Sequence, residues 1–141
     1  MKRHLTTAAL LLALLIVACP ARGDGFKALG KELAKAARKA GMGKVVVVSF
    51  VPADDSNAKD GWFLAEKLTT QVVRSGAVQA VERSMIEKLM DEHRLARTGV
   101  LDQSSIKKLG RVAAADGVIT GSFVTLGTKV AVHARLIDVE T

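Results

Sequence analysis

Residues 116–139 constrain the fold most strongly, because they form two apolar stretches joined by Gly127-Thr128. A two-residue turn at these positions places Leu126 opposite Lys129 and determines every later pair. One face of this hairpin carries the pairs Thr125/Val130, Phe123/Val132, Gly121/Ala134 and Ile119/Leu136. The other carries Val124/Ala131, Ser122/His133, Thr120/Arg135 and Val118/Ile137. A slip of one residue would put Phe123 and Leu136 on opposite faces, so the pattern predicts this register. The first face is then a core face, and the second is mixed.

The first 18 residues have the pattern of a secretory signal peptide. A basic start is followed by an apolar run from Leu5 to Ala18, which is shorter than the roughly 20 apolar residues of a membrane span. The run ends in Ile16-Val17-Ala18-Cys19, which resembles the bacterial lipobox, so we expect Cys19 to become the lipidated first residue. The alternative is an ordinary signal peptide with a cysteine near its end by chance. Cys19 is the sole cysteine, which excludes an intrachain disulfide.

The remaining chain is long enough for one domain and too short for two. Residues 19–25 are rich in helix breakers and predict a tether from the lipid anchor, and residues 26–141 predict the domain. Lys2 and Arg3 leave with the leader, so the formal net charge falls from +7 to +5. This mild charge indicates no specific partner. With no tyrosine and a single Trp62 there is no aromatic platform for stacking bases, and we expect no nucleic acid partner.

Helical and strand patterns alternate along the domain. Helical periodicity predicts helices over residues 26–40, 62–74, about 84–97 and 103–114, the last capped by Asp102. β-Branched runs predict strands over residues 45–51 and 78–81, the former buried on both faces and central in the sheet. We expect a helix to approach Gly121 closely. The order predicts an α/β (α+β) fold, a mixed β-sheet with a C-terminal antiparallel hairpin and helices packed on the sheet.

The first of these helices carries lysines beside an alanine-rich stripe. A basic amphipathic helix after a lipid anchor is also typical of membrane-surface segments. Alanine inserts poorly into lipid and packs closely on a sheet, so the pattern favours packing on the sheet.

The loop at residues 52–61 holds a candidate ligand or cation site formed by Asp54, Asp55, Ser56 and Asn57. Its place after a buried strand favours a site, whereas the lack of a third acidic ligand favours a solvated loop with a helix cap. His93 continues an apolar stripe, and His133 lies in a different element. No nucleophile stands beside a base and no metal-ligand cluster occurs, so we expect no catalytic residues, no metal and no cofactor.

Several blocks resemble the periplasmic domain of the curli secretion lipoproteins (the CsgG family) and the related FlgO domain of flagellar outer-membrane lipoproteins. The blocks are Val81-Glu82-Arg83-Ser84, Ile86-Glu87-Lys88-Leu89, Thr98-Gly99, Lys108-Leu109-Gly110, Asp116-Gly117-Val118 and Arg135-Leu136-Ile137-Asp138. The resemblance implies a non-catalytic α/β domain on a lipid anchor, facing the periplasm from the outer membrane and serving secretion or the assembly of curli or flagella.

Two departures from that family bear on its pore. The secretion channel has a long membrane-spanning insertion where Gly127-Thr128 stands here, and a second one beyond the position of Thr141. A spanning strand needs about 9–11 residues. We therefore expect a scaffold without a pore, like the FlgO-type proteins or the lipoprotein activators of cell-wall synthases. Because the family pattern continues past Thr141, a truncated gene product is an alternative.

The terminal strand, residues 129–139, is predicted to be an open sheet edge that could recruit an envelope or secretion protein or a second copy. Its candidate interaction residues are Lys129, Ala131, His133 and Arg135. The partners expected are thus the membrane, through the anchor, and proteins of the envelope machinery. A periplasmic ligand- or nucleotide-binding module using the 52–61 loop remains the alternative.

Overall fold

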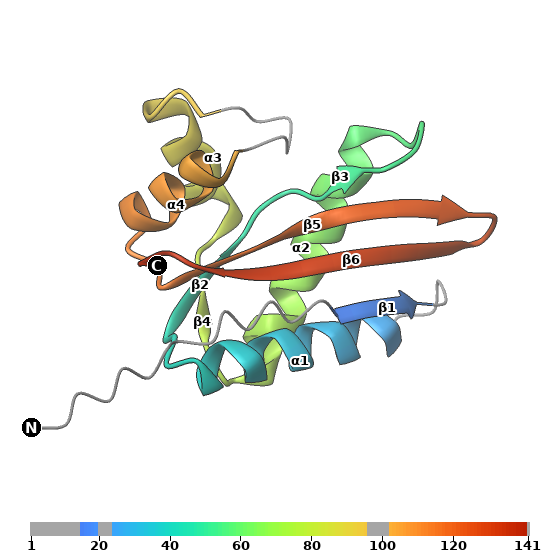
Figure 1. The fold of residues 1–141 in the computed structure, drawn as a ribbon, viewed down its shortest axis with the longest axis horizontal. Helices are drawn as coiled ribbons and strands as arrows, with labels where there is room; N and C mark the ends of the chain where they lie inside the picture. The colour runs from blue at the N-terminus through green and yellow to red at the C-terminus, as the bar shows by residue number, and fades with distance from the viewer. Residues whose placement is uncertain (1–14, 20–23, 96–101, 141) are drawn as a thin grey trace, which may run out of the picture.

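The computed structural model describes residues 15–19, 24–95 and 102–140 as a sheet between two helical layers (Figure 1). Its strands are β1 (Leu15–Cys19), β2 (Lys44–Val47), β3 (Val51–Pro52), β4 (Gln79–Ala80), β5 (Gly117–Leu126) and β6 (Lys129–Asp138). Its helices are α1 (Asp24–Lys39), α2 (Ala58–Ser75), α3 (Arg83–Glu92) and α4 (Gln103–Val112). One core joins α1 and α2 to one face of the sheet, and a second joins α3 and α4 to the other.

The sheet is mixed, as the sequence predicts. Its strand order is β1-β6-β5-β2-β4, and β3 also pairs with β5. The pairs among β2, β3, β4 and β5 are parallel, whereas β5/β6 and β1/β6 are antiparallel. The central strand is β5, so the prediction that residues 45–51 hold that place is wrong. That run divides into β2 and β3, and β5 is long enough to pair with both.

The break in that run has a clear cause in the side-chain packing. Phe50 is 1% exposed and turns into the core on the α1/α2 side. Its N–H donates to the Gly61 carbonyl of α2 at 3.2 Å instead of to a neighbouring strand. The Val48 N–H still donates to the Ile119 carbonyl of β5 at 2.9 Å, and the chain then leaves the sheet and returns as β3.

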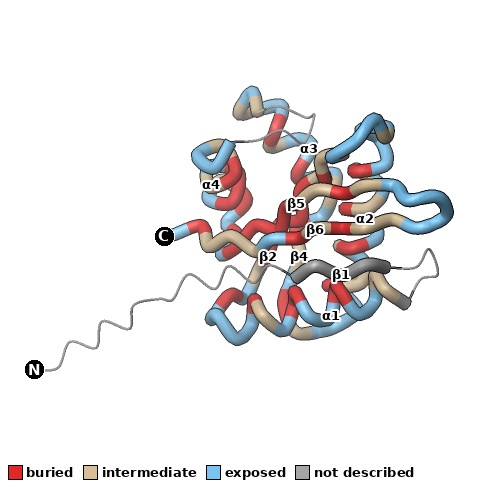
Figure 2. The backbone as a smooth tube through the Cα atoms, turned by 45° about the vertical axis from the view of Figure 1, so that its right-hand side comes forward, coloured by how far each residue is buried: buried red, intermediate tan, exposed pale blue. Residues whose placement is uncertain are grey.

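The hairpin register predicted from the sequence is confirmed at every pair, from Leu126/Lys129 to Val118/Ile137. Gly127 has φ +63°, a conformation that glycine adopts without steric cost. On the predicted core face, Phe123, Val132 and Ala134 are buried against α1 and α2. The tip of the hairpin is exposed (Figure 2).

Several helix boundaries differ from the predictions. α1 runs from Asp24 to Lys39 rather than over residues 26–40, so the end of the predicted 19–25 tether is helical. α2 begins at Ala58 rather than Trp62, because the Asn57 side chain accepts the Lys59 N–H and caps it. α3 ends at Glu92, and the predicted end near residues 97–99 lies outside the described residues. α4 ends at Val112, while its predicted cap is confirmed: Asp102 accepts the Ser105 N–H at 2.7 Å.

α1 packs on the sheet and on α2, as the alanine-rich stripe favours. Leu29, Leu33, Ala34 and Ala37 are buried, whereas Ala40, just past the end of α1, is exposed. Its lysines are exposed to solvent. Across the described ranges no helix combines the length and the apolar character needed to cross a bilayer.

Candidate functional site

A crevice of about 190 Å³ lies at the carboxyl ends of β2 and β4. The chain leaves β2 for α2 on one face of the sheet and leaves β4 for α3 on the other. Neighbouring parallel strands whose connections diverge in this way leave an opening between them, which is the usual ligand position in α/β sheets. The crevice is lined by Val48, Ser49, Trp62, Arg83, Ile86, Glu87 and Met90.

Arg83, the first residue of α3, lines this crevice and contacts several of its other residues. Its Nη1 donates to the Val47 carbonyl at 2.7 Å and its Nη2 to the Ser49 hydroxyl at 3.4 Å. β4 ends at Ala80, so no strand residue reaches the Val47 carbonyl, and the guanidinium takes the place of the next strand amide. Burial lowers the pKa of Arg83, and the nearby Glu87 and Glu66 carboxylates oppose that shift. Its Nε is buried and has no hydrogen-bond partner among the described residues.

Trp62, on the first turns of α2, closes the crevice from the other side. The Arg83 guanidinium carbon lies 5.5 Å from its ring centroid, within cation–π range. The indole Nε1 donates to Glu87 Oε1 at 3.2 Å. The exposed Phe63 packs edge-on against it with ring centroids 5.2 Å apart. The crevice thus combines the Arg83 cation, the Glu87 carboxylate and the apolar side chains of Val48, Ile86 and Met90.

The loop with Asp54, Asp55, Ser56 and Asn57 lies apart from this crevice and is tied to the tip of β5. Asp54 accepts the Ser56 N–H at 3.0 Å and the Thr125 N–H at 3.1 Å, and the Ser56 hydroxyl donates to the Thr125 hydroxyl at 3.1 Å. Hydrogen bonds from Ser56, then from Thr125, hold the pKa of Asp54 below its ordinary value. Asp54 and Ser56 therefore fix the loop to β5, and Asn57 caps the start of α2.

Within the described ranges, no three His, Cys, Asp or Glu side chains gather in a way that could hold a metal ion. His93 follows the end of α3, and His133 lies in the middle of β6.

The predicted interaction strand lies on β6, where Lys129, Ala131, His133 and Arg135 share the mixed face of the hairpin. The expected open edge is occupied in this structure. β1 pairs with β6 antiparallel, from Leu15/Ala134 to Cys19/Val130. The prediction of a free edge thus fails for the full chain, because residues 15–19, most of them in the predicted leader, supply a strand. Self-association through this strand stays a prediction.

Cys19, the predicted lipidation site, is the last residue of β1. It lies opposite Val130, near the tip of the hairpin. The expected lipid modification itself stays a prediction.

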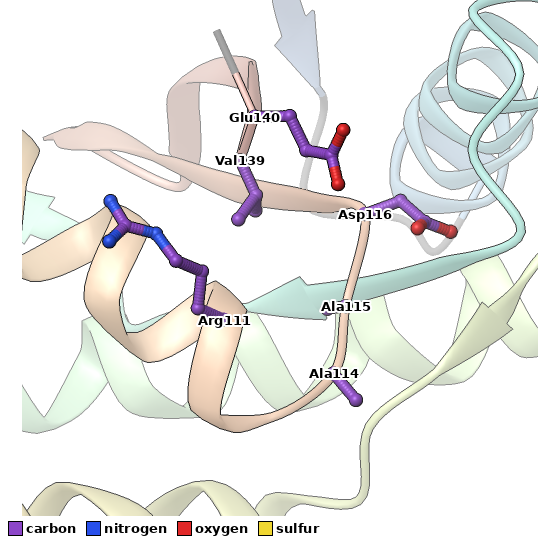
Figure 3. Close-up of a pocket in the computed structure, with 6 residues that line it drawn as sticks. All are labelled: Arg111, Ala114, Ala115, Asp116, Val139 and Glu140. Atoms are coloured by element: carbon purple, nitrogen blue, oxygen red, sulfur yellow. The ribbon is translucent and has the colours of Figure 1, made fainter.

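A second depression, of about 540 Å³, lies at the amino ends of the parallel strands (Figure 3). Asp116 at its rim accepts the N–H groups of Gly43 and Lys44 at 2.8 and 3.1 Å. Figure 3 shows Arg111 and Asp116 pointing away from one another. The polar groups of this depression do not converge, so it is the weaker candidate.

The sequence predicts a candidate site at Asp54, Asp55, Ser56 and Asn57, and that call stays a prediction, whereas the crevice in the structure is lined by other residues. Arg83 and Trp62 were not selected, although each stands at the start of a helix that follows a strand. A signal was available, because a lone arginine directly after a buried strand must find acceptors nearby. Val47 and Ser49 are more than 30 positions away from Arg83, so only the fold brings these groups together.

Comparison with solved structures finds two similar domains. The LpoB C-terminal domain from Escherichia coli matches with a TM-score of 0.59 and 16% identity, covering 82% of this chain and 88% of that one. The LpoB C-terminal domain from Salmonella enterica matches with a TM-score of 0.61 and 16% identity, covering 82% and 89%. At this identity the likeness shows the fold. No protein of curated function matches the chain.

The sequence itself matches one family model, that of the curli production assembly/transport component CsgG, over residues 43–141. This match covers well over half of the chain and includes β2 to β6, the crevice and the hairpin. The chain therefore belongs to the CsgG family.

Proposed function

We propose that this protein is a lipid-anchored, periplasm-facing protein of the outer membrane whose domain serves as an interaction module in secretion or envelope appendage assembly. Two independent features support the proposal. The apolar leader ends at Cys19 with small residues before it. Residues 43–141 match the model of the CsgG family.

The observation that carries the proposal is the hairpin of β5 and β6. Gly127 and Thr128 close it directly, where a channel-forming relative has a spanning insertion. Its inner face is packed in the core, because Phe123, Val132 and Ala134 are each no more than 2% exposed. These side chains would have to leave the core before the hairpin could face lipid. We accordingly propose that the module acts without forming a pore.

Planar-bilayer recording with the purified lipoprotein tests the absence of a pore. We expect a flat baseline at concentrations where a pore-forming family member gives stepwise currents. Stepwise currents from this protein would overturn the proposal.

The process served is tested by deleting the gene and scoring curli fibres, swimming motility and sensitivity to inhibitors of cell-wall synthesis in one strain. We expect loss of one appendage. Increased sensitivity to cell-wall inhibitors alone would instead support the alternative, activation of a cell-wall enzyme. An unchanged strain in all three assays would contradict a role in assembly.

A second candidate function, binding of a small ligand, is favoured by the crevice around Arg83. Nucleotides and divalent cations are the first ligands to screen, by thermal shift of the processed lipoprotein. A ligand that occupies the crevice should raise the melting temperature of the wild type and of Arg74→Met, a change on the exposed end of α2, but not of Arg83→Met. An equal shift in all three proteins would place the ligand elsewhere.

A further inference from the structure

The outer edge of β6 is covered by a strand that the mature protein should not possess. β1 consists of residues 15–19, and cleavage before Cys19, on which this inference rests as part of the proposed function, removes every β1 residue except Cys19. The structure shows that this edge accepts a strand in antiparallel orientation over five residues. Figure 1 shows β1 alongside β6. Cleavage would leave the backbone groups that β1 had paired open to solvent.

The geometry of the Gly127-Thr128 turn determines which backbone groups of β6 point outward, away from β5. In a hairpin with a two-residue turn, the flanking residues Leu126 and Lys129 form a hydrogen-bonded pair, and such pairs alternate along an antiparallel ladder. Ala131, His133 and Arg135 therefore direct their N–H and C=O groups to β5. Val130, Val132 and Ala134 direct theirs outward to β1. Cleavage therefore exposes the outward N–H and C=O groups of three residues, Val130, Val132 and Ala134, whose side chains face the core.

The charge beside this edge indicates what can replace β1. Lys129, His133 and Arg135 lie on the same face of β6, and Lys129 and Arg135 are exposed. Within the described part of the chain, the ion pair formed is Lys88–Glu92, so neither Lys129 nor Arg135 has an acidic partner there. A second copy of β6 would bring like charges into cross-strand positions, which is destabilising. A strand with acidic side chains on this face would bring opposite charges together.

We infer that cleavage of the leader uncovers the outer edge of β6 and that this edge receives, in antiparallel orientation, an extended segment of a partner protein in which acidic and apolar residues alternate. The apolar residues of that segment continue the core side of the sheet beside Val130, Val132 and Ala134. Its acidic residues lie beside His133 and Arg135. Until cleavage, β1 keeps the edge closed, which prevents unspecific edge-to-edge pairing of the precursor.

Amide exchange measured by NMR tests the uncovering step. The full 141-residue chain, made by cell-free synthesis without a leader peptidase, is compared with the processed lipoprotein in detergent. In the processed form the amides of Val130, Val132 and Ala134 should exchange on the order of 100-fold faster, while those of Ala131, His133 and Arg135 stay equally slow in both. Slow exchange of all six amides in the processed form would overturn the inference. Mass spectrometry of the protein isolated from cells distinguishes that outcome from failure of the proposed function. If the proposed function fails, the isolated protein still contains residues 1–18.

Two synthetic peptides test the chemistry of the partner strand. A peptide of alternating glutamate and valine should restore slow exchange at Val130, Val132 and Ala134, and a peptide of alternating lysine and valine should not. Arg135→Glu should reverse this preference, whereas Lys67→Glu, a matched change on the exposed side of α2, should leave it unchanged. Equal protection by both peptides would contradict the charge argument. Protection that rises with protein concentration alone would identify a second copy as the occupant and overturn the choice of partner.

Discussion

At the scale of single residues, Gly121 shows which contact leaves no room for a side chain. The sequence predicts that a helix approaches it, and this is wrong: an added Cβ would overlap the His133 carbonyl of β6 and lie 2.8 Å from the Phe50 ring. The obstacle is thus backbone of the neighbouring strand. Backbone held by a ladder cannot shift as a side chain can.

We expect Gly121→Ala to lower the free energy of unfolding by about 3 kcal/mol, the upper end of the range for overpacked cores. Gly43→Ala is the matched control, because its added Cβ would meet only the Asp116 carboxylate at 3.6 Å, an ordinary contact. Urea denaturation of both variants measures the difference. Equal midpoints would show that the strands separate more freely at Gly121 than the structure implies.

Asp54 and Asp55 form a matched pair for a pH experiment. Asp54 accepts N–H groups from Ser56 and Thr125, and no hydrogen bond of Asp55 is found among the described residues. Because the pKa of Asp54 is lowered from 3.8 in the folded protein, its ionised form stabilises the fold above about pH 4. This contribution is lost as the pH falls through the folded pKa.

We therefore expect Asp54→Ala to lower the urea midpoint at pH 7 and Asp55→Ala to leave it nearly unchanged. The difference between the two variants should shrink below pH 4, where wild-type Asp54 becomes protonated. If the difference in urea midpoint between the two variants stays constant down to pH 2, the charge of the Asp54 carboxylate does not hold the loop against β5.

At the scale of elements, the short β4 strand makes Arg83 necessary. β4 pairs with β2 at Lys44 and Val45, and Val81 then donates to the Val45 carbonyl at 3.0 Å. The next carbonyl that faces this edge belongs to Val47, and the Arg83 side chain supplies its donor. A helix residue thus completes the hydrogen bonding of the strand end while it shapes the crevice.

We expect Arg83→Met to destabilise the domain by about 1 kcal/mol. Loss of the donor leaves the buried Val47 carbonyl unsatisfied, at a cost of about 1–3 kcal/mol, and removal of the buried, unpartnered Nε offsets part of it. Arg74→Met, on the exposed last turn of α2, should change stability by less than about 0.5 kcal/mol. Guanidinium denaturation compares the two. A more stable Arg83→Met protein would show that burial of the charge outweighs its hydrogen bonds.

At the scale of the whole molecule, the proposed attachment to the membrane depends on Cys19. Labelled palmitate should enter the wild-type protein and not Cys19→Ser, because the thiol is the single attachment point that the sequence offers. The residue after the cysteine is Pro20, not the aspartate associated with retention at the inner membrane. We therefore expect the labelled protein in the outer-membrane fraction of a density gradient. Equal labelling of both proteins would contradict lipidation at Cys19.

Local patterns in the sequence determined the parts of the fold whose causes are local. The two-residue turn and the alternation of residues 117–138 specified the hairpin pair by pair, because a shift of one position would expose the core face. Asp102 predicted a helix start because its carboxylate and the Ser105 N–H are only three positions apart. Membership of the CsgG family could also be predicted from the sequence, since the blocks that resemble the family lie within one continuous stretch, residues 43–141.

Only the tertiary structure decided what depends on distant segments. The crevice needs β2, α2 and α3 together, and periodicity carries no information on which strand ends adjoin. β5 is central because it pairs with β2 and β3 on one side and with β6 on the other, and β propensity does not specify which strands become neighbours. The edge of β6 is closed by residues of the predicted leader, more than 100 positions away in the chain, and local sequence patterns carry no information on a contact of such separation.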